Sequence, residues 1–257
     1  DGNPMALISL THFNVLFTPL PEPPSLVFVA GGRAPGSSWL RDLCREKDVW
    51  AVDRGLDHCM AAGIKPSFFI GDSDSVSEGA LRWSREENIP SLLFSPEKDL
   101  TDLQLALKEA GGAYGVSPGR NRRAAILTGA FGGRFDHLFA NLFSLIWAEE
   151  EWGMKVRCVA DESEALFILK GGETLRLSGL EEGGVLSTLA LSEKCLGVRM
   201  KGTKWTIREG SLYLNKPFAV SNIAEATVEV GLSSGWLGIY WAAREFTGRQ
   251  QKPKGRS

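Results

Sequence analysis

The chain has 257 residues, 43% hydrophobic and 23% charged, which suffices for one large or two modest domains with a buried core. Its net charge of -2 excludes the strong basic field typical of a nucleic-acid-binding protein. No stretch approaches the roughly 18 consecutive apolar residues of a membrane span, and the chain lacks the basic start of a signal peptide. The four cysteines are scattered without metal-ligand spacing, and we expect a reducing cytoplasmic setting.

Short apolar runs alternate with helical stretches through the first half of the chain, after a proline-rich lead-in. The predicted strands cover residues 26–30, 49–52, 67–70, 91–94 and 124–128. Predicted helices cover residues 37–44, 56–62, 77–88 and 101–110, and a longer helix follows residue 137. Strands and helices that alternate at these lengths predict a doubly wound parallel sheet.

Two aspartates, Asp72 and Asp74, follow the predicted strand over residues 67–70. Positions i and i+2 of an extended backbone face the same side, so the two carboxylates can converge on one hard cation. The carboxyl end of a parallel strand is where open α/β folds bind ligands, and a magnesium ion and a phosphate fit there. An Asx-turn that simply ends the strand is the alternative.

A helix start is well marked at Thr101, because Thr101 and Gln104 have the spacing of a capping box. Asp102 therefore falls in the first helical turn. There a carboxylate is favoured by the helix dipole, so a plain N-terminal charge is the alternative to a functional role.

A glycine-rich turn over residues 129–133 joins a predicted strand to a long helix and is followed by Arg134. Glycines at such a turn let backbone amides approach a phosphate, and an arginine adds a bidentate donor. The spacing matches neither a P-loop nor the full dinucleotide fingerprint. His137 forms no ligand pattern with the other two histidines, which favours a hydrogen-bonded structural role over metal ligation.

From about residue 154 the sequence pattern changes to short runs of alternating apolar and polar residues that are separated by glycines. This pattern predicts an all-β module. These runs cover residues 156–159, 165–169, 174–177, 185–191, 196–200, 211–214 and 227–230. The module contains Trp205 and the pair Ser221-Asn222. Residues 247–257 are basic and lack apolar side chains, so we expect a disordered tail.

Taken together, these stretches resemble the thiamine pyrophosphokinase family in its bacterial form. The resemblance rests on residues 52–55, 63–66, 71–75, 98–102, 129–137, 141, 202–205 and 221–222. Two departures stand out, since the family more often has an aromatic residue where this chain has Ser73, and some members carry Asn where it has Asp57. The Asp57 position is given no role by analogy.

The resemblance implies an N-terminal doubly wound α/β domain followed by an all-β sandwich-like domain, working as a homodimer. The implied boundaries are a lead-in over 1–25, an ATP- and magnesium-binding domain over 26–153, a thiamine-binding domain over 154–246 and the tail over 247–257. The implied reaction transfers pyrophosphate from ATP to the hydroxyethyl group of thiamine, giving thiamine diphosphate and AMP, with Mg²⁺ as cofactor.

The resemblance also assigns roles to individual residues. Magnesium would be held by Asp72, Asp74 and Asp102, and the catalytic group would be these three with Arg134. ATP would contact Asp53, Arg54, Gly55, Asp99, Thr101, Gly129, Gly132, Gly133, Arg134, Asp136 and His137. Thiamine would contact Trp205, Ser221 and Asn222. A strand-end cap is the alternative for Asp53, and the identity of any general base stays open between Asp102 and Asp74.

Three other functions use the same parts. A pyrophosphokinase for another alcohol, such as a hydroxymethyl pterin, would differ in its acceptor pocket. A non-catalytic nucleotide-binding module would bind ATP without turnover, and a phosphatase using the two aspartates would hydrolyse phosphate esters with no acceptor. All three metal-type aspartates are present, which argues against the non-catalytic module.

Overall fold

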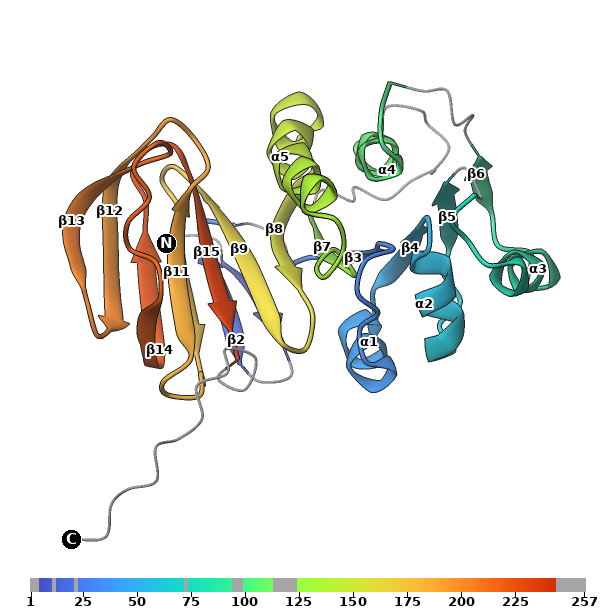
Figure 1. Ribbon diagram of the computed structural model, residues 1–257, viewed down its shortest axis with the longest axis horizontal. Helices are drawn as coiled ribbons and strands as arrows, with labels where there is room; N and C mark the ends of the chain where they lie inside the picture. The colour runs from blue at the N-terminus through green and yellow to red at the C-terminus, as the bar shows by residue number, and fades with distance from the viewer. Residues whose placement is uncertain are drawn as a thin grey trace, which may run out of the picture. The chain divides into compact units, whose positions relative to one another are not determined.

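The computed structural model describes residues 5–10, 13–20, 23–71, 74–93, 99–112 and 124–243. The chain divides into two compact units (Figure 1). One spans Glu22–Glu162 and is called the α/β unit here. The other combines Asp1–Pro21 with Ser163–Ser257 and is called the β unit. Together they make a mixed α/β fold with extensive sheet.

The α/β unit is built on a parallel sheet. Its strands are β3 (Leu26–Val29), β4 (Asp48–Val52), β5 (Phe68–Gly71), β6 (Ser91–Leu93), β7 (Ala124–Thr128) and β8 (Lys155–Ala160). Their order is β8-β7-β3-β4-β5-β6, and each neighbouring pair is parallel. The strand order reverses between β3 and β7, which creates a crevice at their carboxyl ends.

Five helices cover this sheet. They are α1 (Ser37–Cys44), α2 (Gly55–Ala62), α3 (Glu78–Glu86), α4 (Asp102–Ala110) and α5 (Phe135–Trp152). α1, α2 and α3 lie on one side of the sheet, and α4 and α5 lie on the other (Figure 1). Because both faces are covered, β3 and β7 are buried along their whole length and consist of apolar residues and one threonine.

The helix signals read from the sequence are present where they were expected. The capping box at Thr101 and Gln104 is formed in both directions, with Gln104 N–H donating to Thr101 Oγ1 at 3.3 Å and Thr101 N–H donating to Gln104 Oε1 at 2.9 Å. Helix α2 ends at Gly63, whose φ of 66° is the left-handed conformation that glycine adopts at little cost.

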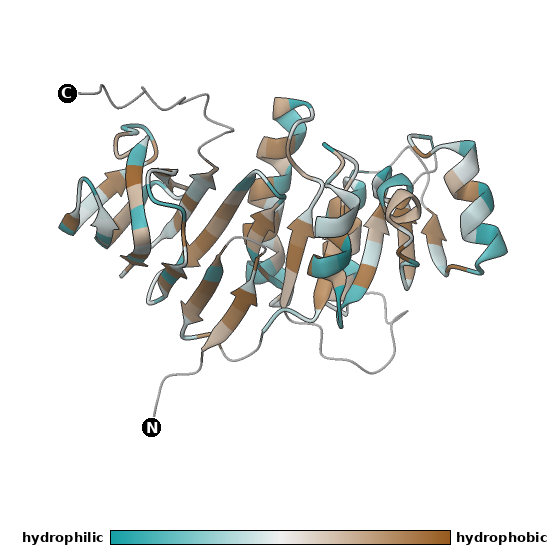
Figure 2. Ribbon diagram, turned by 90° about the horizontal axis from the view of Figure 1, so that it is seen from below, coloured by the Kyte–Doolittle hydropathy of each residue, from teal (hydrophilic) through white to brown (hydrophobic). Residues whose placement is uncertain are grey.

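The β unit is antiparallel throughout. Its strands are β1 (Ala6–Ser9), β2 (Asn14–Thr18), β9 (Glu164–Lys170), β10 (Thr174–Ser178), β11 (Val185–Ala190), β12 (Lys194–Thr203), β13 (Ile207–Tyr213), β14 (Asn222–Gly231) and β15 (Trp236–Ala242). One set pairs in the order β1-β2-β10-β14-β12-β13, and another in the order β14-β11-β15-β9. β14 belongs to both sets. The strands of both units contain many hydrophobic residues (Figure 2).

The boundaries of the two units differ from the domain boundaries expected from the sequence. Residues 155–160 were expected in the all-β module, but β8 pairs parallel with β7 in the α/β unit. Residues 1–25 were expected to be a lead-in, but β2 pairs with β10, and Phe13 packs edge-on against Trp241 with ring centroids 4.6 Å apart. Buried aromatic contacts of this kind explain why the N-terminal strands join the β unit.

Two further expectations can be compared with the structure, and others concern residues that the structure does not describe. All four cysteines, Cys44, Cys59, Cys158 and Cys195, are buried and unpaired with one another. Within the described ranges, none of the helices is both long enough and apolar enough to cross a membrane. Asp72 and Ser73, Lys98, and the expected tail over 247–257 lie outside the described residues.

Candidate active site

A cleft of ≈ 290 Å³ lies on the β unit, and a larger one of ≈ 720 Å³ lies on the α/β unit at the carboxyl ends of its strands. Residues 30–32 after β3, residues 53–54 after β4 and residues 129–130 after β7 form part of the larger cleft. The first turn of α4 and the beginning of α5 complete its wall. The cleft therefore sits where the strand order reverses, the position at which open α/β sheets bind ligands.

Most of the residues predicted to contact ATP line this cleft. They are Asp53, Arg54, Thr101, Gly129, Gly133, Arg134, Asp136 and His137, and the predicted metal ligand Asp102 lines the cleft as well. The remaining residues of that set, Gly55, Asp99 and Gly132, are not in the lining. Local patterns at three separate places in the chain thus converge on one concave surface, because the carboxyl ends of parallel strands meet at one edge of the sheet.

Gly55 has a packing role in the structure. A Cβ added there would lie 1.7 Å from the backbone oxygen of Val29, which is far inside van der Waals contact. Only glycine lets the first residue of α2 approach β3 this closely. Gly55 thereby brings the adjacent Asp53 and Arg54 against the end of the central strand.

Asp53 directly follows β4 in a left-handed conformation, with a φ of 51° that is uncommon for a residue other than glycine. Its N–H donates to the carbonyl oxygen of Ile70 at 3.0 Å, so the neighbouring strand β5 helps to hold this turn. Strained backbone of this sort is often found at functional sites. Its position in the cleft wall agrees with that interpretation.

Arg134 and Asp136 form an ion pair at the start of α5. Arg134 Nε donates to Asp136 Oδ1 at 3.1 Å, and the His137 N–H donates to the same oxygen at 3.1 Å. The hydrogen bond from Arg134 lowers the pKa of the Asp136 carboxyl, and the same bond raises the pKa of Arg134. Both side chains are exposed, so the pair keeps the guanidinium oriented at the cleft without strongly desolvating it.

The predicted metal ligands are only partly visible. Asp102 lines the cleft in the first turn of α4, and Ser75, next to the exposed Asp74, lines it as well. Asp72 lies outside the described residues. Among the residues that are described, no group of three or more histidine, cysteine or acidic side chains is arranged to hold a metal ion.

The predicted thiamine-binding residues lie in the β unit, where two of them are hydrogen-bonded to each other. Asn222 is 3% exposed, and its Oδ1 accepts hydrogen bonds from the N–H groups of Trp205 at 3.1 Å and Ile223 at 2.9 Å. Its Nδ2 donates to the Trp205 carbonyl at 2.7 Å. Asn222 thus fixes the backbone of Trp205, whose ring is 56% exposed.

Trp205 already has a cation at its ring. The Lys204 ammonium lies 4.8 Å from the ring centroid, within the range of a cation–π interaction. Ser221, the third predicted residue, is exposed, and its N–H donates to Ser187 Oγ at 2.9 Å. A φ of 58° places Ser221 in the left-handed region.

The sequence reasoning overlooked the turn at residues 30–32 as part of the site. Gly31 and Gly32, which follow the predicted strand over residues 26–30, were not among the predicted site residues, although they line the cleft. The same pattern, a buried strand followed by glycines, was recognised at residues 129–133. A buried strand followed by glycines therefore also predicts that residues 30–32 form part of the site. Beneath it lies His58, whose Nε2 is 3.1 Å from the Gly32 carbonyl oxygen.

Comparison with known proteins places these features in a wider context. Residues 40–158 match the family model for the thiamin pyrophosphokinase catalytic domain. A thiamine pyrophosphokinase of Bacillus subtilis (strain 168) is 28% identical over 198 residues, which cover 76% of this chain and 86% of that protein.

Solved structures share the fold. The crystal structure of thiamine pyrophosphokinase from Bacillus subtilis matches with a TM-score of 0.71 at 22% identity, covering 85% of this chain and 98% of that one. Thiamin pyrophosphokinase from Candida albicans matches with a TM-score of 0.70 at 14% identity, covering 85% and 88%. At these identities the similarity concerns the fold.

Proposed function

We propose that this chain belongs to the thiamine pyrophosphokinase family and that it transfers pyrophosphate from ATP to the hydroxyethyl group of thiamine, giving thiamine diphosphate and AMP. One observation carries the proposal. The matched region, residues 40–158, contains Asp53, Asp102 and Arg134, and all three line the ≈ 720 Å³ cleft at the reversal of the strand order. Such a cleft is large enough for a nucleotide.

The finer architecture is part of the proposal. The α/β unit would be a doubly wound domain that binds ATP and magnesium, and the β unit a sandwich-like domain that binds thiamine. Helices on both sides of the parallel sheet support the first assignment. β14, which pairs in both sets of antiparallel strands, supports the second.

Side-chain and backbone groups that line the cleft are suited to binding a triphosphate. The Arg134 guanidinium, pre-oriented by Asp136, would bind phosphate oxygens as charge builds on the leaving AMP. Backbone at Gly129 and Gly133 can approach the phosphates closely because glycine has no side chain. The thiamine hydroxyl would need orientation towards the β-phosphorus more than strong activation, since positioning dominates phosphoryl-group transfer.

We propose that Asp72, Asp74 and Asp102 would hold Mg²⁺. Carboxylate oxygens are the ligands this ion prefers, and Asp102 lies in the cleft wall beside Thr101. When bound, the ion would neutralise charge on the triphosphate. Removal of divalent ions with a chelator should abolish AMP formation, and re-addition of magnesium should restore it.

The acceptor would stack on Trp205. Thiamine carries a cationic thiazolium, and the Lys204 ammonium near the indole ring supports the capacity of that ring to bind a cation. Asn222 would act through Trp205, because its amide is bonded to the Trp205 backbone. Ser221 would supply a hydroxyl to the pyrimidine edge.

A homodimer in the cytoplasm completes the proposal, on the basis of the family resemblance. If each active site takes residues from both copies, mixing Asp102→Asn and Asn222→Ala subunits should form hybrid dimers with one intact site, which brings the KM for thiamine back towards the wild-type value. Sedimentation measures the oligomeric state directly. An active monomer would contradict this part of the proposal while leaving the reaction itself intact.

Product analysis tests the reaction. Incubation with ATP, magnesium and thiamine should release AMP in step with thiamine consumption, because the β-phosphorus and not the γ-phosphorus is attacked. Stoichiometric ADP would show phosphate transfer and would overturn the proposal. ATP hydrolysis that does not depend on thiamine would indicate a phosphatase instead.

A further inference from the structure

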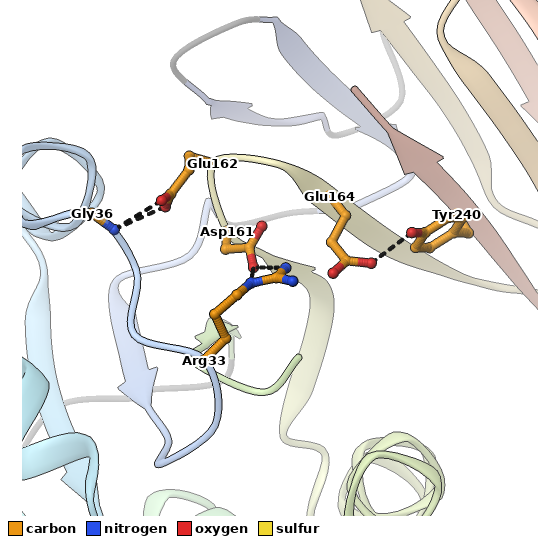
Figure 3. Close-up of polar contacts among 6 residues, drawn as sticks. All are labelled: Arg33, Gly36, Asp161, Glu162, Glu164 and Tyr240. Atoms are coloured by element: carbon orange, nitrogen blue, oxygen red, sulfur yellow. Dashed lines mark hydrogen bonds and ion pairs between the residues drawn. The ribbon is translucent and has the colours of Figure 1, made fainter. Parts of the chain in front are cut away.

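The turn after β3, residues 30–36, is held from both ends by contacts with distant parts of the α/β unit (Figure 3). We propose that Arg33 and Asp161 are positioning residues that hold the two glycine turns of the cleft at a fixed separation for the nucleotide. The proposal rests on the proposed function in one respect, that this cleft binds a nucleoside triphosphate.

The first glycine turn is bonded directly to the second. Gly32 N–H donates to the Gly129 carbonyl oxygen at 2.6 Å, and Arg33 N–H donates to the Phe131 carbonyl oxygen at 2.6 Å. Both turns line the cleft. Any displacement of Arg33 would therefore move the backbone of both turns.

The Arg33 side chain extends this connection. A Cβ added at Gly132 would lie 2.7 Å from the Arg33 Cβ, so the second turn packs against the Arg33 side chain. Gly132 also has a φ of 71°, which other residues adopt only with strain. The Arg33 side chain is thus wedged against the second turn.

Asp161 anchors this wedge from the end of β8. Arg33 Nε donates to Asp161 Oδ2 at 3.0 Å, and the Arg33 Nη2 forms an ion pair with the same oxygen. The Asp161 side chain is 3% exposed. A buried carboxylate paired with arginine holds its partner in one geometry, and loss of either group leaves the other without its main compensation.

Glu162 adds a second anchor at Gly36, three residues after Arg33. Its carboxylate accepts hydrogen bonds from the Gly36 N–H at 2.9 and 3.1 Å. Gly36 is the N-cap of α1, which has no side-chain cap and no acidic residue in its first turn. Glu162 therefore supplies, from a distant segment, the negative charge that this helix terminus favours.

The expected consequence concerns ATP more than thiamine. Phosphate-binding backbone must be held accurately, since small displacements of binding groups cost much of their effect. Asp161→Asn should raise the KM for ATP about 5- to 10-fold. Arg33→Lys should have a smaller effect on this KM, because lysine keeps the positive charge but lacks the planar guanidinium with its paired N–H donors. The KM for thiamine should be unchanged.

The experiment compares these variants with a matched control, a buried carboxylate of α5 that pairs with an arginine of β8. Glu149→Gln removes the carboxylate of the buried pair between Glu149 and Arg157, and Arg157 lies in β8 four residues before Asp161. Its effect should appear in the melting temperature, with a wild-type KM for ATP below that temperature. Arg33→Ala combined with Asp161→Asn should be no worse than the more damaging single variant, because the two groups act as one unit.

Two measurements that need no turnover accompany the kinetics. ATP binding by calorimetry should weaken in Asp161→Asn, and hydrogen exchange at the Gly32 and Arg33 amides should become faster as the bonds to the second turn open. Wild-type ATP affinity and wild-type exchange in Asp161→Asn would overturn the inference, as would an equal loss of ATP affinity in Glu149→Gln. If the wild-type protein bound ATP but released no AMP with thiamine, the proposed function would fail, and the binding and exchange data would still decide the inference.

Discussion

The structure arranges the residues predicted to bind ATP differently from those predicted to bind thiamine. Eight of the former line one cleft of the α/β unit, where their side chains or backbone face a common space. In the β unit, Asn222 is buried and bonded to the backbone of Trp205, so part of that set supports another member. A motif shared with a family therefore marks residues that build a site as well as residues that touch a ligand.

The largest effect should follow from changing the carboxylate in the cleft. Asp102→Asn should lower kcat at least ~10²-fold with little loss of stability, because a lost metal ligand removes transition-state charge stabilisation. Steady-state kinetics and thermal melting measure the two quantities. Asp42→Asn, an exposed aspartate on α1, is the control, and near-wild-type turnover of Asp102→Asn would remove that residue from the metal site.

Gly55 tests whether a motif residue outside the cleft lining works through packing. Gly55→Ala places a Cβ against the Val29 carbonyl, and this overpacking should lower the free energy of unfolding by about 1–3 kcal/mol or more. Denaturant unfolding measures the loss. Gly63→Ala offers a comparison, since no atom lies within 4 Å of an added Cβ there although its φ is positive. A Gly55→Ala protein of normal stability but weak ATP binding would instead assign Gly55 a contact with the nucleotide.

Trp205 and Asn222 sharpen the distinction between contact and support. Trp205→Ala should raise the KM for thiamine several-fold, since a cation on an aromatic face contributes roughly 0.5–2 kcal/mol. Asn222→Ala should raise it as well, because the Trp205 backbone loses its two hydrogen bonds to the Asn222 side chain. The KM for ATP should stay unchanged in both. Unchanged thiamine KM in both variants would place the acceptor pocket elsewhere.

The smallest expected effect concerns His58, beneath the cleft wall. Burial lowers the pKa of His58 below its ordinary 6.5, so the folded state binds this proton less readily than the unfolded state. The corresponding stability is present above pH 6.5 and is lost as the pH falls towards the folded pKa. Wild-type stability should therefore fall more steeply than that of His58→Gln between about pH 7.5 and pH 5.5. Parallel profiles would contradict this.

The sequence by itself determined the local elements and much of the ATP site. The capping box at Thr101 and the glycine stop at Gly63 depend on neighbouring residues, so local patterns suffice to predict them. Asp53, Asp102 and Arg134 converge for a simple reason, because each follows or begins an element at the same edge of a parallel sheet.

The tertiary structure alone decided which distant segments meet. It placed residues 155–160 beside β7 and residues 14–18 beside β10, since strand partners are chosen by long-range packing that leaves no local periodicity. The same holds for Arg33 and Asp161, which are 128 residues apart in the chain. Their ion pair depends on the position of β8 in the sheet, which no spacing in the sequence encodes.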